Sequence, residues 1–343
     1  MHRGRAIIIK ILLFAGVLSL PTAGAAAAQP IRIKLATAAP KGTCWDRALQ
    51  ELSQQLEQET DGRLKLTIYA GGMVGDESNI VRKMRVGQFQ AAMVTSVGMS
   101  IIDSSITALS HIPLFYDSYE EFDYVRDQLA DELEQRFYEK GYFILNWGEA
   151  GWVHFFTQSP MTHPDDLKPM KLFFWANESG DPSIWLDLGY HPVPLASTEV
   201  MMGLQTGLID AFDTTPLVAL GKQWFALAPH MCDMRWAPLV GATILRRDIW
   251  DKILPQDQII LKRLAINFGE AIKKEGRELE LLSIQVMVEH GLIVHPVSDE
   301  YQKLWKESVE QAYPRIRGNI VPTEYFDRVH AIRSEYRGLH KSK

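Results

Sequence analysis

Cysteine is scarce in this chain, because its 343 residues include only Cys44 and Cys232, far apart in the sequence. A chain of this length can bury a core large enough to be stable without disulfide bonds. The two thiols are therefore either free and partly buried or joined in a single bridge, since the sequence does not show whether their geometry permits the bond.

The chain also has no excess of positive charge. The 36 basic and 42 acidic residues give a net charge of −6 and lie scattered along the chain, without a long block of lysine or arginine. Proteins that follow the phosphates of nucleic acid usually carry such blocks. The composition therefore argues against a nucleic-acid partner, and its 46% hydrophobic and 23% charged residues are those of an ordinary globular protein.

The common catalytic motifs are absent as well. The sequence has no Gly-x-Ser-x-Gly elbow, no phosphate-binding Gly-x-x-x-x-Gly-Lys, no dinucleotide Gly-x-Gly-x-x-Gly and no His-Glu-x-x-His pair. Its ten histidines lack the spacing of metal ligands. We therefore predict that the protein is not an enzyme and holds no metal or cofactor.

One long apolar run is present, at the N-terminus. Residues 6–20 are apolar except for Lys10 and Ser19, follow a basic start and lead through Pro21 into small residues. The run is shorter than the roughly 20 residues of a spanning helix, and the pattern is that of a secretory signal peptide. We predict that residues 1–28 are cleaved after Ala28 and that the mature protein is soluble in the periplasm. The first cysteine follows well after that point, so no lipid anchor is expected.

Strand-like and helix-like patterns alternate through the remaining chain. Residues 31–40 and 63–70 alternate as strands, and residues 45–62 show helical spacing, as do the residues before the strand at 91–95. This order predicts a βαβαβ unit with a parallel sheet. A second α/β alternation begins near residue 142, and one unusually long helix is expected from Gln256 to about His290.

The length and these two alternations predict a two-lobed α/β protein. We assign residues 29–150 and 238–290 to lobe I, and residues 151–237 and 291–343 to lobe II with the C-terminal helices. Chain crossings near 150 and 237 would then join the lobes, and the long helix would bridge them. Hinge-closing proteins of this kind bind a ligand in the cleft between the lobes.

Several segments together resemble one family, the solute-binding subunits of tripartite ATP-independent periplasmic (TRAP) transporters. They are IRIKLATAAPKG, YAGGMVGDESNIVRKMRVGQFQAAMV, DDLKPMKLFFW and LGYHPVPLASTEVMMGLQTGLIDAFDTTP. The resemblance covers nearly all of the mature chain. It implies the type II-like periplasmic binding fold, a small-molecule ligand and membrane permease subunits as partners.

One position departs from that family. Its members generally carry a Lys-Ile-Arg strand whose arginine binds a substrate carboxylate through two parallel hydrogen bonds. This chain has Lys171, Leu172 and Phe173 there, and no arginine lies between Pro169 and Pro182. An aromatic ring adds apolar surface in place of the guanidinium, so we predict a largely apolar ligand such as a sterol, an isoprenoid or a fatty-acid-like molecule.

The ligand-binding residues predicted on this basis are aromatic groups that would form the wall and polar groups that would orient one hydroxyl or ketone. They are Trp45, Thr95, Ser96, Trp147, Glu149, Phe173, Trp175, Asn177, Phe212, Asp213, Thr214 and Trp236. Aromatic residues are more often core than ligand contacts, so this set depends on its members acting together.

Three alternatives remain open at this point, and one of them is an enzyme on a similar scaffold. The other two are binding proteins. The protein is a conventional TRAP receptor for a small organic acid that uses another cation, with Arg82 and Arg85 as candidates, or it is a periplasmic lipid carrier that serves a different trafficking system.

Overall fold

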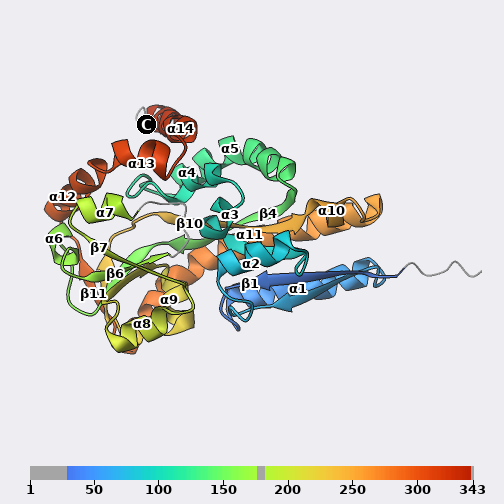
Figure 1. The fold of residues 1–343 in the computed structure, drawn as a ribbon, viewed down its shortest axis with the longest axis horizontal. Helices are drawn as coiled ribbons and strands as arrows, with labels where there is room; N and C mark the ends of the chain where they lie inside the picture. The colour runs from blue at the N-terminus through green and yellow to red at the C-terminus, as the bar shows by residue number, and fades with distance from the viewer. Residues whose placement is uncertain (1–28, 176–181, 341–343) are drawn as a thin grey trace, which may run out of the picture.

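The computed structural model describes residues 29–175 and 182–340 (Figure 1). The predicted signal peptide, residues 1–28, lies outside the described residues. Two sheets form the framework, and helices cover their faces. The predicted two-lobed α/β fold is confirmed.

The first sheet has the strand order β2-β1-β3-β10-β4. Its strands are β1 (Ile31–Thr37), β2 (Leu64–Tyr69), β3 (Ala91–Thr95), β4 (Tyr142–Trp152) and β10 (Pro238–Arg246). Strand β1 runs parallel to β2 and β3, as the βαβαβ prediction requires, whereas β10 runs antiparallel to β3 and β4. Residues Ile33 and Leu35 of β1 are buried, in keeping with the alternation in the sequence.

Helices pack on both sides of this sheet. They are α1 (Cys44–Glu59), α2 (Glu77–Arg85), α3 (Ser96–Ser100), η1 (Ser104–Ile106), α4 (Thr107–Ser110), α5 (Tyr119–Glu139) and α10 (Arg247–Trp250). Side chains that accept backbone N–H groups fix two of the helix starts. Asp76 accepts from Asn79 at 2.9 Å at the start of α2, and Ser118 accepts from Glu121 at 3.2 Å at the start of α5.

The second sheet has the strand order β11-β9-β5-β8-β6-β7. Its strands are β5 (His154–Thr157), β6 (Lys171–Trp175), β7 (His191–Leu195), β8 (Ala211–Thr214), β9 (His230–Asp233) and β11 (Ile293–Pro296). The helices between them are α6 (Pro164–Leu167), α7 (Ser183–Asp187), α8 (Val200–Thr206), α9 (Pro216–Lys222) and η2 (Trp224–Ala226). Strand β5 is antiparallel to both of its neighbours, while β6 is parallel to β7 and β8.

The chain passes between the sheets at two adjacent connections. One leads from β4 through Val153 into β5, and the other leads from β9 through Trp236 and Ala237 into β10. The two connections are hydrogen bonded to each other, because Val153 N–H donates to Ala237 O and Trp236 N–H donates to Val153 O, both at 2.9 Å. The predicted crossings, near 150 and 237, lie at these connections.

The long helix α11 (Pro255–Glu289) packs against elements of both sheets. The predicted helix ran from Gln256 to about His290, which matches these bounds closely. Phe268 and Ile272 lie in one core with Leu49 of α1, and Met287 near the other end lies in the core of the second sheet. The helix therefore bridges the two halves, as Figure 1 shows.

The C-terminal segment divides between the two halves. Its elements are α12 (Asp299–Glu310), α13 (Tyr313–Asn319) and α14 (Thr323–His340). Trp305 of α12 packs with the second sheet, but Ile316 and Val329 share a core with Phe122 of α5. The division into lobes stays a prediction. The last helices, which it groups with lobe II, bury their apolar side chains against α4 and α5.

Cys44 and Cys232 are free and buried, which is one of the two alternatives that the sequence left open. Burial raises the pKa of the Cys44 thiol to about 11 and that of the Cys232 thiol to about 12. Both groups are therefore protonated and unreactive at neutral pH.

Candidate functional site

Two adjoining cavities lie between the sheets. We call the first, of about 100 Å³, the lysine chamber, because Lys222 of α9 is part of its wall. We call the second, of about 130 Å³, the aromatic chamber, because Phe155, Phe173, Trp185 and Trp236 are part of its wall. Trp175, Thr214 and Leu239 line both cavities, so the chambers meet at these three residues.

The lysine chamber has walls from both halves of the molecule. Trp45, Met93, Asn146, Glu149 and Thr243 line it from the side of the first sheet. The second half contributes Trp175, Ser197, Thr214, Val218, Lys222 and Trp224. A ligand here would contact both halves at once, which is the arrangement that couples binding to closure of a hinge.

Lys222 is the one lysine or arginine among the described residues that line the chambers. It is half-buried at the last position of α9, and no described residue forms an ion pair or hydrogen bond with its ammonium group. Burial lowers its pKa from the ordinary value, because removing the charged form from water is unfavourable. A negatively charged ligand would offset this desolvation.

Glu77 is a second titratable group on the wall of the lysine chamber. Its carboxyl accepts hydrogen bonds from Thr95 N–H at 2.9 Å, from the Thr95 hydroxyl at 2.8 Å and from Gly98 N–H at 2.8 Å. Burial nevertheless raises the pKa of Glu77 above its ordinary value. Glu77 therefore joins α2 to the start of α3 through these hydrogen bonds.

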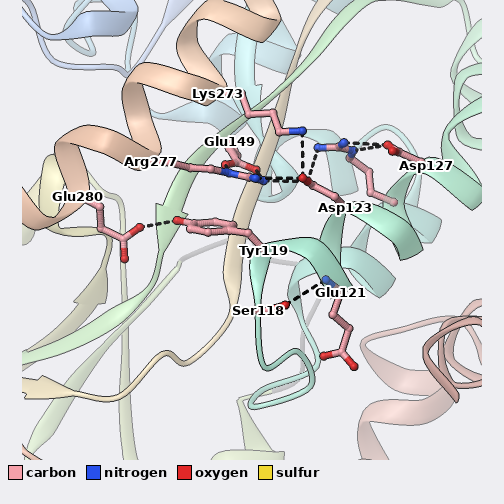
Figure 2. Close-up of polar contacts among 10 residues, drawn as sticks. Ser118, Tyr119, Glu121, Asp123, Asp127, Glu149, Lys273, Arg277 and Glu280 are labelled. Atoms are coloured by element: carbon pink, nitrogen blue, oxygen red, sulfur yellow. Dashed lines mark hydrogen bonds and ion pairs between the residues drawn. The ribbon is translucent and has the colours of Figure 1, made fainter. Parts of the chain in front are cut away.

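Glu149 of β4 also lines the lysine chamber, but its charge is neutralised by Arg277 of α11 (Figure 2). Arg277 Nη2 donates to Glu149 Oε2 at 2.9 Å, and its Nε donates to the other carboxylate oxygen. The guanidinium also holds Asp123 of α5 at 2.8 and 3.0 Å, and Lys273 contacts Asp123 at 3.1 Å. In the same cluster the Tyr119 hydroxyl donates to Glu280.

Two buried polar atoms on the wall of the lysine chamber have no partner among the described residues. They are Asn146 Oδ1 and Thr243 Oγ1, on neighbouring strands β4 and β10 at paired register positions. Thr243 is 1% exposed. An unsatisfied buried polar group costs about 1–3 kcal/mol. The Thr243 hydroxyl can donate to an acceptor on a ligand, whereas Asn146 Oδ1 requires a donor.

The aromatic chamber has a different wall. The centroid of the Trp236 ring lies 4.8 Å from that of Phe155, 6.2 Å from that of Trp185 and 6.0 Å from that of Trp305. Ser96, which is fully buried, has a hydroxyl without a partner among the described residues. The wall includes His111 and Asp213 but no described lysine or arginine.

Comparison with known proteins bears on what binds in these chambers. The sequence profile of the bacterial extracellular solute-binding proteins of family 7 matches residues 35–319. The chain belongs to this family. It is the family of TRAP solute-binding proteins, which bind solutes in the periplasm, so the resemblance found in the sequence is confirmed.

The curated relatives of this family 7 protein are distant. A solute-binding protein of Roseobacter denitrificans is 29% identical over 54% of this chain and 57% of the relative, so that alignment spans little more than half of its length. The C4-dicarboxylate-binding periplasmic protein of Rhodobacter capsulatus is 22% identical over 91% of this chain and 94% of the relative.

Solved structures show the same fold. The sugar acid binding protein of Advenella mimigardefordensis, in complex with galactonate, superposes with a TM-score of 0.83 at 17% identity, over 90% of this chain and 99% of that one. Among the described residues of this family 7 protein, no helix is both long and apolar enough to span a membrane. The same part of the chain has no cluster of three potential metal ligands.

The structure brings most of the predicted site residues to the two chambers. Trp45, Thr95 and Glu149 line the lysine chamber, and Ser96, Phe173, Asp213 and Trp236 line the aromatic chamber. Trp175 and Thr214 line both. Their contact with a ligand stays a prediction, and Asn177 lies outside the described residues.

Two predicted residues line neither chamber. Trp147 lies on the other face of β4 from Asn146 and donates its Nε1–H to Glu134 of α5 at 2.9 Å. Phe212 is fully buried in the core of the second sheet, where its ring stacks on Phe156 at 5.1 Å. Side chains alternate between the faces of a strand, and in both cases the predicted ligand contact is a core or helix contact instead.

Sequence reasoning missed the cation and several polar groups. Arg82 and Arg85, the candidate cations, are exposed on α2 and line neither chamber. Lys222, Asn146 and Thr243 line the lysine chamber instead. No sequence signal distinguishes Lys222 from a solvated lysine at a helix end, because its importance comes from the burial that the opposite sheet provides.

Proposed function

We propose that this protein is the receptor of a TRAP-type importer and captures a small organic acid, with Lys222 as the counterion of the ligand carboxylate. The closed, acid-bound protein would then present the acid to membrane permease subunits of the same transporter class. The observation that carries this proposal is the half-buried ammonium group of Lys222, which no described residue pairs, on the wall of a cavity between the sheets.

The charge balance of the lysine chamber supports an anion. Arg277 pairs with Glu149, and Glu77 accepts three hydrogen bonds while burial raises its pKa above the ordinary value. Lys222 is the one cation on the described wall, and no described residue pairs with it. A buried charge without a partner is costly, and a carboxylate that pairs with it offsets this cost.

An uncharged ligand fits this wall less well. A sterol or another neutral lipid, which Phe173 led us to predict, would desolvate Lys222 further and leave its ammonium group unpaired. The relatives favour an acid as well, because the Rhodobacter capsulatus protein is named for C4-dicarboxylates and the Advenella mimigardefordensis protein was solved with galactonate. We therefore favour the organic-acid alternative over a neutral lipid.

Isothermal titration of the purified protein tests the proposal. The probes are galactonate, succinate, and straight-chain monocarboxylates from acetate to dodecanoate, with the primary alcohol of the same length as the neutral match for each monocarboxylate. We expect at least one acid to bind, and Lys222→Met to weaken it by about 10- to 100-fold, as removal of a charge-assisted hydrogen bond does.

Lys303→Met is the matched control, because it also removes one positive charge but lies 78% exposed in a pair with Glu307. It should leave the affinity unchanged. Equal affinity of the wild-type protein for an acid and its matched alcohol would contradict the proposal, as would Lys222→Met with unchanged affinity.

A further inference from the structure

We infer that the ligand is an amphipathic monocarboxylate that occupies both chambers, with its carboxylate at Lys222 and its apolar portion in the aromatic chamber. This inference rests on the proposed function, and it adds the orientation and the chemical class of the acid. It applies to straight-chain and aryl-substituted acids alike, since both present one carboxylate and one apolar end.

The continuity of the two chambers is the first step. Trp175 at the end of β6, Thr214 at the end of β8 and Leu239 of β10 line both. A ligand held against these three residues therefore has the lysine chamber on one side and the aromatic chamber on the other. Two of the three side chains are apolar, so the junction suits a hydrocarbon part of the ligand better than a charged one.

The distribution of charge sets the direction of the ligand. Lys222 lies on the wall of the lysine chamber, and the described wall of the aromatic chamber has neither lysine nor arginine. The ligand carboxylate is therefore placed in the lysine chamber.

The opposite end of the ligand meets aromatic rings. Trp236, Trp185 and Phe155 form contacting ring pairs on the wall of the aromatic chamber, and Phe173 packs against Trp175 at 5.2 Å. Burying the apolar surface of a ligand against such a wall makes binding more favourable, whereas burying a hydroxylated surface there contributes little. A polyhydroxylated sugar acid would lose hydrogen bonds to water against these aromatic rings, which cannot replace them.

The titration series already described tests this inference on the wild-type protein. We expect affinity for monocarboxylates to rise by about fourfold for each added methylene group, the gain from burying one such group, until the aromatic chamber is filled. A dicarboxylate of the same length should bind at least 100-fold more weakly, because its second carboxylate would enter the aromatic chamber, whose described wall has neither lysine nor arginine.

Two variants change the size of the aromatic chamber. Leu172→Trp fills part of it, and Trp185→Leu enlarges it, because both side chains line this chamber and neither lines the lysine chamber. The chain length of tightest binding should become shorter in Leu172→Trp and longer in Trp185→Leu. Leu227→Trp is the matched control, since Leu227 is also half-buried in the second half but lines neither chamber.

The results separate this inference from the proposed function. Acids that bind through Lys222 without any dependence on chain length, or dicarboxylates and galactonate that bind more tightly than every monocarboxylate, would overturn the two-chamber inference and leave the acid receptor standing. Chain-length dependence that is identical for acids and alcohols, with no loss in Lys222→Met, would overturn the proposed function. Loss of folding in either chamber variant is detected by circular dichroism, and the wild-type series still decides the outcome.

Discussion

Arg277, on the helix that bridges the two sheets, holds the carboxylate of Glu149 on the wall of the lysine chamber through both of its oxygens. The Glu149 side chain is 2% exposed and that of Arg277 is 23% exposed. The same guanidinium binds Asp123 of α5 (Figure 2). The pair therefore ties the site wall to two helices and removes from the chamber a negative charge that would repel an acid.

Arg277→Met should lower the free energy of unfolding by about 3 kcal/mol, because it leaves the buried Glu149 carboxylate without its partner. Adding Glu149→Gln should recover part of this loss. Urea denaturation measures both effects. Lys303→Met, at an exposed pair, is the control and should change stability by less than about 0.5 kcal/mol. A loss in Arg277→Met no larger than in this control would contradict the structural role of the pair.

Gly151→Ala should destabilise the protein by about 2 kcal/mol. Gly151 precedes the connection between the sheets with φ = +101°, and an added Cβ would lie 3.3 Å from Glu280 Oε2. Gly338→Ala is the control, because it lies inside α14 with open space around it and should be neutral or stabilising by up to about 1 kcal/mol. Thermal unfolding measures the stability change in each variant. Equal changes in Gly151→Ala and Gly338→Ala would contradict backbone strain at Gly151.

Thr243→Val should stabilise the free protein by about 1 kcal/mol and weaken acid binding. The reason is that Thr243 Oγ1 is buried without a described partner on the chamber wall, and valine has the same shape without the polar atom. Thr157→Val is the control, because that buried hydroxyl donates to Ser159 O at 2.6 Å and its removal should destabilise the protein. Denaturant unfolding and titration of the tightest-binding acid measure the two effects. Destabilisation by Thr243→Val would show that the hydroxyl already has a partner.

Acid binding should depend on pH through Lys222. Burial lowers the pKa of this lysine in the free protein, and a bound carboxylate favours the protonated form, so the pKa rises on binding. The affinity is therefore constant below the free-state pKa and falls above it by up to about tenfold per pH unit. The fall should begin below pH 10.5, the ordinary value, when titrations are repeated from pH 7 upward. An affinity that does not change up to that pH would exclude Lys222 as the counterion. In Lys222→Arg the affinity should not fall over this pH range, because arginine stays protonated.

Much of the fold could be predicted because its signals are local. The alternation in β1 and β2 and the helical spacing of α1 set the parallel βαβ order, since burial on one face fixes the period of apolar residues. The long helix α11 was predicted within one residue at each end. The placement of α13 and α14 was not, because an amphipathic helix does not specify which of two apolar surfaces it will cover.

The site was predictable only where a strand end determines it. Asp213 and Thr214 are the last two residues of the buried strand β8 and line the chambers. Trp147 and Phe212 lie on strands whose buried faces point toward a helix or the core, and one residue of register decides between these outcomes. Lys222 shares a cavity wall with residues more than 70 positions away in the sequence, among them Asn146 and Glu149, and no local pattern indicates this proximity.

The paired connections at Val153 and Trp236 have a mechanical consequence. Because two backbone hydrogen bonds join them, they form a short two-stranded ribbon rather than two independent tethers. Any movement of one half relative to the other must therefore bend this ribbon as a unit together with α11. The wall that carries Lys222 is joined through these elements to the wall that carries Asn146 and Thr243.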